Sequence, residues 1–235
     1  MGELGTILGV WAHPDDETYL AAGLMARAAA EGDRVVVITA TKGEGGSWDE
    51  KQWPSETMGE VRAAELEESL RILGVKEHHW LGYIDATCHE IPLEEGTAKI
   101  QTFIEDVRPD TILTFGPDGM TGHKDHQAVC AWTTEAFRRA AKPGAKLHYA
   151  VVSREWADEF VPRMNKFNVF QPGYPPIAEP EDMSIGFALG PEILERKVQA
   201  IGAHVSQVEY MLRYFGQDFF REAHKDEMFR LAEAK

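Results

Sequence analysis

A group of residue types that bind metal ions follows the first apolar segment of the chain. The group is Ala12-His13-Pro14-Asp15-Asp16-Glu17, with one histidine and three carboxylates. His13 and Asp16 are three residues apart, so they can converge on one ion from a strand end and the first turn of a helix. Acidic residues also occur at helix N-termini simply as caps. Capping explains the carboxylates, but it does not explain His13.

A second polar group, His123-Lys124-Asp125-His126, follows another apolar segment at 111–115. Its two histidines are three residues apart, which places them near each other at one end of a helix. Either histidine alone is more often structural or exposed than a ligand. Two such groups, each after a strand and each opening a helix, are not explained by capping. Together they predict one metal site.

The ligand count favours a catalytic site. A structural zinc site has four protein ligands and commonly uses cysteine, which both groups lack. His13, Asp16 and His126 supply three ligands and leave a position for water, as catalytic zinc sites do. Asp15, adjacent and free of the metal, is placed to act as general base. Zinc is the expected metal, and Fe²⁺ or another divalent ion is left open because two histidines and one aspartate bind several.

The remaining residues of the second group have open roles. His123 is expected to face the reacting carbonyl, where it would stabilise an oxyanion or protonate the leaving amine. Asp125 either orients the ring of His123, as carboxylates behind catalytic histidines do, or is simply solvated.

The elements that must position these residues alternate between strand and helix. Strand-like segments are short, continuous and rich in β-branched residues, and apolar stripes with helical spacing lie between them. This alternation predicts an α/β fold, a Rossmann-like, doubly wound, mostly parallel sheet with helices on both faces. Molecules that bind to such sheets do so beyond the carboxyl ends of the strands, and both polar groups lie there. We expect strands at 6–11, 35–39, 78–83, 111–115 and 147–152, and helices around 63–73 (ended by Gly74), 100–107, 129–137 and from 191.

We expect a single domain over 1–235. Its regular core covers about 1–152, and an irregular extension with C-terminal helices covers about 153–235. The proline-rich segment 171–180 suits neither a regular helix nor a central strand. This segment either forms part of the wall of the site or makes a contact in a homo-oligomer.

Composition restricts the partners. The net charge of −15 argues against nucleic acid and anionic membranes, and no apolar run is long enough to span a membrane. The first residues lack the pattern of a signal peptide, so we expect a cytoplasmic protein. Two cysteines outside any CxxC pair do not form a disulfide framework.

The two polar groups also carry a family resemblance. AHPDDE at 12–17 with HKDH at 123–126 resembles the LmbE-like, or PIG-L, N-deacetylases, which include the GlcNAc-phosphatidylinositol de-N-acetylases. The likeness extends to TKGEG at 41–45, LGY at 81–83 and several single positions. The chain departs from the family at Lys124, where proline is frequent; we expect this site to face solvent.

The resemblance implies a zinc-dependent hydrolase that removes an acetyl group from a small N-acetylated substrate, typically a glucosaminide. It implies the same three zinc ligands and Asp15 as base. It also implies that Arg62, Glu44 and Asp85 bind the substrate. An exposed, salt-bridging arginine is the alternative interpretation of Arg62.

Three other functions remain to be separated from this one. A nucleotide-binding Rossmann domain lacks support, because no GxGxxG follows the first strand. A metal-dependent phosphoesterase usually needs more ligands than these groups offer. A non-catalytic sugar-binding relative would have no need of Asp15.

Overall fold

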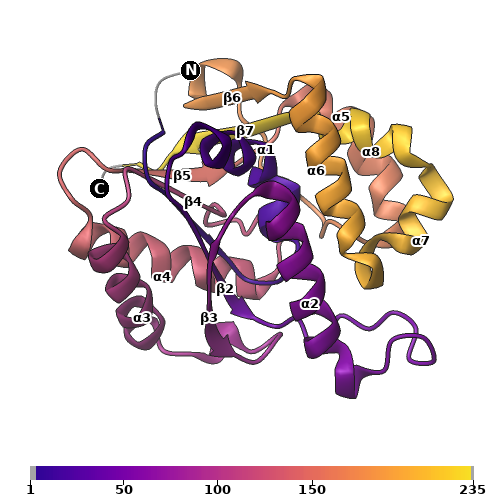
Figure 1. Cartoon of the computed structure of the whole chain (residues 1–235), viewed down its shortest axis with the longest axis horizontal. Coiled ribbons are helices and arrows are strands. Elements are labelled where there is room, and N and C mark those ends of the chain that lie inside the picture. The colour runs from indigo at the N-terminus through magenta and orange to yellow at the C-terminus, as the bar shows by residue number, and fades with distance from the viewer. Residues whose placement is uncertain (1–3, 234–235) are drawn as a thin grey trace.

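The computed structural model describes residues 4–233 and contains one seven-stranded sheet (Figure 1). The strand order is β3-β2-β1-β4-β5-β7-β6. The first five strands run parallel, and β7 and β6 continue the sheet in antiparallel fashion. The predicted doubly wound α/β sheet is confirmed. The strands are β1 (Ile7–Trp11), β2 (Val35–Thr41), β3 (Glu77–Tyr83), β4 (Thr111–Thr114), β5 (Lys146–Ala150), β6 (Ile185–Ala188) and β7 (Asp226–Leu231).

Helices cover both faces of the sheet (Figure 1). The central strands β1, β2 and β4 are buried along their whole length, which is why their sequences are apolar without alternation. Helices α1, α2 and α6 pack together on one side, and α3 and α4 pack together on the other. Their bounds are α1 (Asp16–Glu31), α2 (Ser55–Leu73), α3 (Leu93–Val107), α4 (Lys124–Ala140) and α6 (Pro191–Ala203).

The helix ends follow from local residue chemistry. Gly74 ends α2 at a φ of 82°, a conformation that glycine adopts without strain, as its position predicts. Helix α1 begins at Asp16 and not at Pro14. The reason is Asp15, whose φ of 110° is not helical and therefore delays the helix.

The segment after residue 152 is more regular than expected. It contributes two strands of the sheet as well as helices, and β7 pairs with β5, so residues on both sides of the expected boundary share one sheet. The single-domain interpretation stays a prediction. Only the stretch between α5 and β6 is largely irregular, with short 3₁₀ turns at Asn165–Phe167 and Pro180–Asp182. The helices here are α5 (Arg154–Met164), α7 (Val205–Phe215) and α8 (Gln217–Ala223). No helix within residues 4–233 is long and apolar enough to cross a membrane.

The strand order places a topological switch point between β1 and β4. The chain leaves β1 toward β2 on one side and leaves β4 toward β5 on the other. The two connections therefore diverge and open a crevice at the carboxyl ends of these strands. His13 lies just after β1, and His126 lies in the first turn of the helix that follows β4.

A buried ion pair joins the C-terminal part to the core. Lys197 of α6 and Glu227 of β7 are both fully buried, with Nζ and Oε1 2.7 Å apart. The same carboxylate accepts hydrogen bonds from the backbone N–H groups of Gly23 and Leu24 in α1 (2.7 and 2.8 Å). Three elements thus meet at one carboxylate.

We predict that Lys197→Met destabilises the protein by about 3–5 kcal/mol, because the substitution leaves a buried carboxylate without its cation. Lys225→Met is the matched control, since Lys225 pairs with Glu222 on the surface and exposed pairs contribute ~0–1 kcal/mol. Urea unfolding of both variants measures the difference. Equal stability losses would show that the buried pair has no special role.

Candidate metal centre

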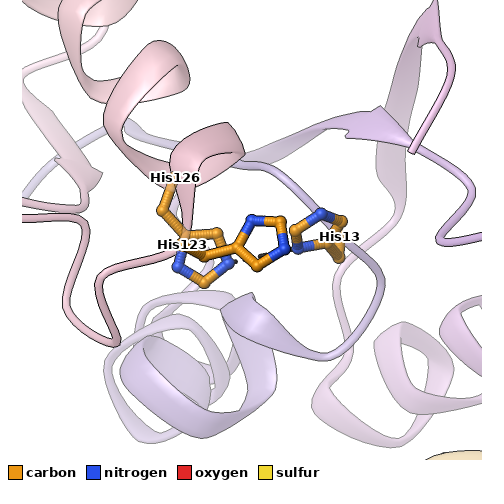
Figure 2. Close-up of side chains that lie close together, drawn as sticks. All are labelled: His13, His123 and His126. Atoms are coloured by element: carbon orange, nitrogen blue, oxygen red, sulfur yellow. Dashed lines mark hydrogen bonds between the residues drawn. The ribbon is translucent and has the colours of Figure 1, made fainter. Parts of the chain in front are cut away.

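The three predicted ligands lie together at the switch point (Figure 2 shows the histidines). His13 Nδ1 is 3.1 Å from His126 Nε2. One oxygen of Asp16 is 3.3 Å from the same nitrogen of His126, and its other oxygen is 3.6 Å from His13 Nδ1. Each of the three residues, counted with its backbone, is less than one-tenth exposed. The sequence prediction that these residues converge is therefore met by the geometry.

These separations fit a tetrahedral metal ion. Ligands at ~2.0–2.1 Å from zinc in tetrahedral geometry lie roughly 3.3–3.4 Å from one another. The His13–His126 separation of 3.1 Å and the Asp16–His126 separation of 3.3 Å are close to that value. The 3.6 Å contact with His13 is made by the other oxygen of Asp16, which accepts a hydrogen bond from the backbone N–H of His13 at 2.8 Å. The donor set of two imidazole nitrogens and one carboxylate suits zinc and several other divalent metals.

His126 is oriented as a metal ligand by its surroundings. Its Nδ1 lies 2.9 Å from the carbonyl oxygen of Gly119, which can only accept a hydrogen bond, so Nδ1 carries the proton. The unprotonated Nε2 then faces His13 and Asp16. Phe115 stacks on the ring with a centroid distance of 4.0 Å. Burial, followed by the charges of the neighbouring histidines, lowers the pKa of His126 well below its usual value. A neutral imidazole is the form that binds metal.

His13 is surrounded by carboxylates. Its Nε2 lies 3.0 Å from Asp85 Oδ1 and 3.4 Å from Asp125 Oδ2. Burial lowers the pKa of His13, but the contacts with Asp125 and Asp85 outweigh burial and raise it to about 10. The environment of His13 therefore favours positive charge, either as a proton on the ring or as a metal ion beside it.

The Asp125 carboxylate contacts His13 and not His123, in contrast to the expectation from sequence. It is fully buried and accepts hydrogen bonds from the backbone N–H groups of Ala86 (2.7 Å) and Cys88 (3.1 Å). Asp125 is thus fixed from behind and lies against the far nitrogen of a metal ligand. A solvated Asp125, the other alternative, is excluded by this burial.

His123 occupies the N-cap of α4. Its Nδ1 accepts a hydrogen bond from the backbone N–H of Asp125 at 3.2 Å. Its ring centroid lies 4.8 Å from that of His13 and 5.1 Å from that of His126 (Figure 2). The three histidines offer nitrogens close enough to share one ion, so His123 is a second candidate ligand as well as a candidate oxyanion donor. Its catalytic role stays a prediction.

Asp15 and Arg62 form a pair beside the ligands. Arg62 Nη2 lies 3.2 Å from Asp15 Oδ2 and donates to the carbonyl of Pro14 at 2.6 Å, and Nη1 donates to the carbonyl of Gly43 at 3.1 Å. Arg62 is 5% exposed, so it is not the solvated arginine that its place on a helix could indicate. It joins the loops after β1 and β2 and orients Asp15. Its contact with substrate stays a prediction.

Glu44 and Asp85 lie one step further from the ligands. Glu44 Oε2 accepts a hydrogen bond from the backbone N–H of Asp85 at 3.2 Å, and Asp85 Oδ2 accepts one from Gly45 at 2.9 Å. These bonds join the loops after β2 and β3 and hold Asp85 against His13. Substrate binding by either residue stays a prediction.

Comparison with known proteins identifies the family. Residues 8–137, more than half of the chain, match the family described as PIG-L: GlcNAc-PI de-N-acetylase. The chain belongs to this family.

Individual proteins agree with the match. The chain is similar to a 1D-myo-inositol 2-acetamido-2-deoxy-alpha-D-glucopyranoside deacetylase from Thermobifida fusca, with 31% identity over 86% of this chain and 83% of that protein. The protein of the same description from Rhodococcus erythropolis is 29% identical over 86% and 81%. Among solved structures, the N,N'-diacetylchitobiose deacetylase from Pyrococcus horikoshii shares the fold, with a TM-score of 0.68, 21% identity and coverage of 97% of this chain and 83% of that one.

A cavity of about 250 Å³ opens beside the candidate metal ligands of this PIG-L family protein. Asp15, Asp16 and His126 lie at its polar end, while most of its wall comes from elements after residue 150. The sequence did not reveal these wall residues, because aromatic and methionine side chains at helical spacing also occur in ordinary cores. The proline-rich segment lies nearby, since the N–H of Gln171 donates to the carbonyl of Thr121 at 3.0 Å. The main wall residues are Trp156, Phe170, Met211, Phe219 and Phe220.

We predict that the purified protein binds about one divalent ion per chain. His13→Ala and His126→Ala should lose most of it, because each removes one of three ligands. Asp125→Asn should keep the site but weaken metal affinity about 10–100-fold, since it removes the charge that orients His13. Chelator competition with elemental analysis measures these changes, and His79→Ala, an exposed histidine of β3, is the control. Full metal retention in both alanine variants would contradict the ligand assignment.

Proposed function

We propose that this protein is a zinc-dependent hydrolase that removes the acetyl group from the nitrogen of a small N-acetylglucosaminide. The observation that carries the proposal is the buried cluster of His13, Asp16 and His126, with nearest contacts of 3.1, 3.3 and 3.6 Å, and the carboxylate of Asp15 beside it in the wall of a cavity. Family membership supports the reaction class. The names of the relatives, which describe 2-acetamido-2-deoxy sugars, support the substrate class.

The residues divide the reaction between them. When bound to His13, Asp16 and His126, the metal supplies Lewis acidity that polarises the amide carbonyl and activates water near neutral pH. Asp15 takes the proton of the attacking water. Burial raises the pKa of Asp15, and the Arg62 guanidinium opposes this rise. The base is therefore held near the site by Arg62 while it remains able to accept a proton.

His123 completes the site from the other side of the carbonyl. Its Nδ1 is occupied by the backbone N–H of Asp125, which leaves Nε2 for the substrate. A protonated Nε2 would donate to the developing oxyanion or to the leaving amine. The sugar would contact Arg62 of α2, Glu44 of the loop after β2 and Asp85 of the loop after β3. Asp125 acts as a positioning residue through His13.

The cysteines support the proposed location of the protein, and the ligand set supports the proposed metal. Both cysteines are buried and unpaired, which fits the proposed cytoplasmic location. Zinc is favoured by the mixed nitrogen and oxygen ligand set, although availability in the cell often decides the metal.

The activity itself is tested by acetate release from a panel of N-acetylglucosaminides. Activity should disappear after removal of the metal with a chelator and return with added zinc. Hydrolysis of aryl phosphates in place of amides would favour the phosphoesterase alternative. Binding without turnover would favour the non-catalytic sugar-binding alternative.

We predict that Asp15→Asn retains the metal and lowers kcat about 10²–10⁴-fold, because asparagine cannot take the water's proton. Asparagine tolerates the positive φ of residue 15, so the backbone should be undisturbed. Asp218→Asn, at a fully exposed carboxylate, controls for the loss of one charge. Near-normal turnover with bound metal would mean that Asp15 only shapes the loop.

We predict that His123→Asn retains the metal while kcat falls about 10²–10³-fold, the effect of losing one oxyanion donor. Asparagine is chosen because it preserves the N-cap of α4, which alanine would remove. The loss should appear in kcat more than in KM, since the charge develops only in the transition state. Loss of the metal would instead make His123 a fourth ligand.

A further inference from the structure

The cavity beside the metal ligands continues well beyond them. It runs from Asp16 and His126 past the end of β5 and between helices α5, α7 and α8. Binding sites for small molecules are typically concave, mostly apolar pockets with a few polar groups. The partly open pocket of about 250 Å³ next to the candidate metal ligands fits that description.

The cavity wall is mostly apolar, and its polar lining lies near the metal ligands and also around β7, where His224, Asp226 and Glu227 border it. Tyr19, Gln207 and Tyr210 border it together with Asp15. The pKa of Tyr19 and of Tyr210 is raised, first by burial and then by the negative charge of Asp15, so both phenols face the Asp15 end. Gln207 extends from α7 and donates to the carbonyl of Gly46 at 3.1 Å. Hydroxyl-bearing parts of a substrate can find partners here.

Aromatic side chains form a large part of the remaining wall. They are Trp156, Phe170, Phe219 and Phe220, and no lysine or arginine within residues 4–233 borders the cavity. A sugar ring at this wall would leave its hydroxyl groups without hydrogen-bond partners. An anionic group would meet the carboxylates at the polar end without a counter-charge. Glu227 also borders the cavity, but Lys197 neutralises it.

The volume exceeds the need of an acetyl group. At roughly 30 Å³ for each water-sized group, the three non-hydrogen atoms of an acetyl group need about 90 Å³. The cavity has about 250 Å³. The remaining space is shared between the part of the sugar that enters the polar end and a longer acyl chain.

We propose that this apolar cavity binds the acyl group of the amide substrate, and that the enzyme prefers neutral, apolar N-acyl chains longer than acetyl. The inference rests on the proposed function, because it needs the scissile amide at the metal ligands. With the amide there and the sugar at the polar end, the acyl chain is the part of the substrate that extends into the cavity.

A series of N-acylglucosamines tests the preference. With acetyl, propionyl, butyryl and hexanoyl substrates, kcat/KM for glucosamine release should rise roughly fourfold for each methylene that is buried. Octyl N-acetylglucosaminide is run in parallel. Faster hydrolysis of acetyl than of every longer chain would overturn the inference and leave the deacetylase function intact. A gain from the octyl group without a gain from longer acyl chains would assign the cavity to an aglycone and also overturn it.

A substitution in the wall links the preference to the cavity. Met211, half-buried on α7, borders the cavity, whereas Arg213 on the same helix is exposed. Met211→Trp should fill part of the space and lower the hexanoyl-to-acetyl ratio of kcat/KM at least tenfold. Arg213→Trp, the same new side chain on the outer surface, should leave that ratio unchanged. Equal ratios in both variants would contradict binding in this cavity.

Calorimetry separates failure of the inference from failure of the proposed function. N-hexanoylglucosamine should bind the Asp15→Asn variant at least tenfold more tightly than N-acetylglucosamine, with a negative heat-capacity change from apolar burial. If no N-acylglucosamine is hydrolysed by the unmodified protein, the proposed function fails and the inference fails with it; if N-acetylglucosamine is hydrolysed, the proposed function stands and the two affinities decide the inference alone. Equal affinities would overturn it, and tighter binding of the hexanoyl compound would support it.

Discussion

The short distance between His13 Nδ1 and His126 Nε2 depends on the order of strands in the sheet. The two residues are 113 positions apart in the chain, and only the neighbouring positions of β1 and β4 bring them within 3.1 Å. Two imidazole nitrogens at this distance cannot both present lone pairs without repulsion. A shared proton or a metal cation between them removes it. Nearby carboxylates, including Asp85 and Asp125, add negative charge that favours the cation.

Burying those carboxylates has a cost that the backbone offsets. A carboxylate removed from water is strongly disfavoured unless hydrogen bonds and opposite charge replace its hydration. Asp125 accepts two backbone N–H groups and Asp85 accepts one. These bonds come from the loops after β2 and β3, so elements that supply no ligand still determine where His13 lies.

Sequence patterns predicted the central sheet and the clustering of His13, Asp16 and His126 because both leave local signals. A fully buried parallel strand is an uninterrupted apolar run, and the ligand groups directly follow two such runs. Strand β7 was missed because its inward positions include Glu227, a charged residue that breaks the apolar pattern and is satisfied by Lys197. The orientation of Asp125 was missed for a related reason. Proximity in sequence suggested His123, whereas the fold places the carboxylate against His13, which is distant in the chain.

The chemistry and the space around it are encoded in different parts of the chain. The family match covers residues 8–137, which include all three predicted ligands, Asp15 and His123. Most of the cavity wall comes from residues 151–228, which lie beyond that match. Helix α8 leads directly into β7, and the Lys197–Glu227 pair joins α6 to the same strand, so the elements around the wall are fixed by contacts outside it. Because α7 carries Tyr210 and Gln207 toward Asp15 as well as Met211 in the wall, one helix borders both the reactive end and the apolar end of the cavity. Substitutions along α7 can therefore alter which amides fit without touching the metal ligands, and a reaction fixed at β1 and β4 can serve different substrates.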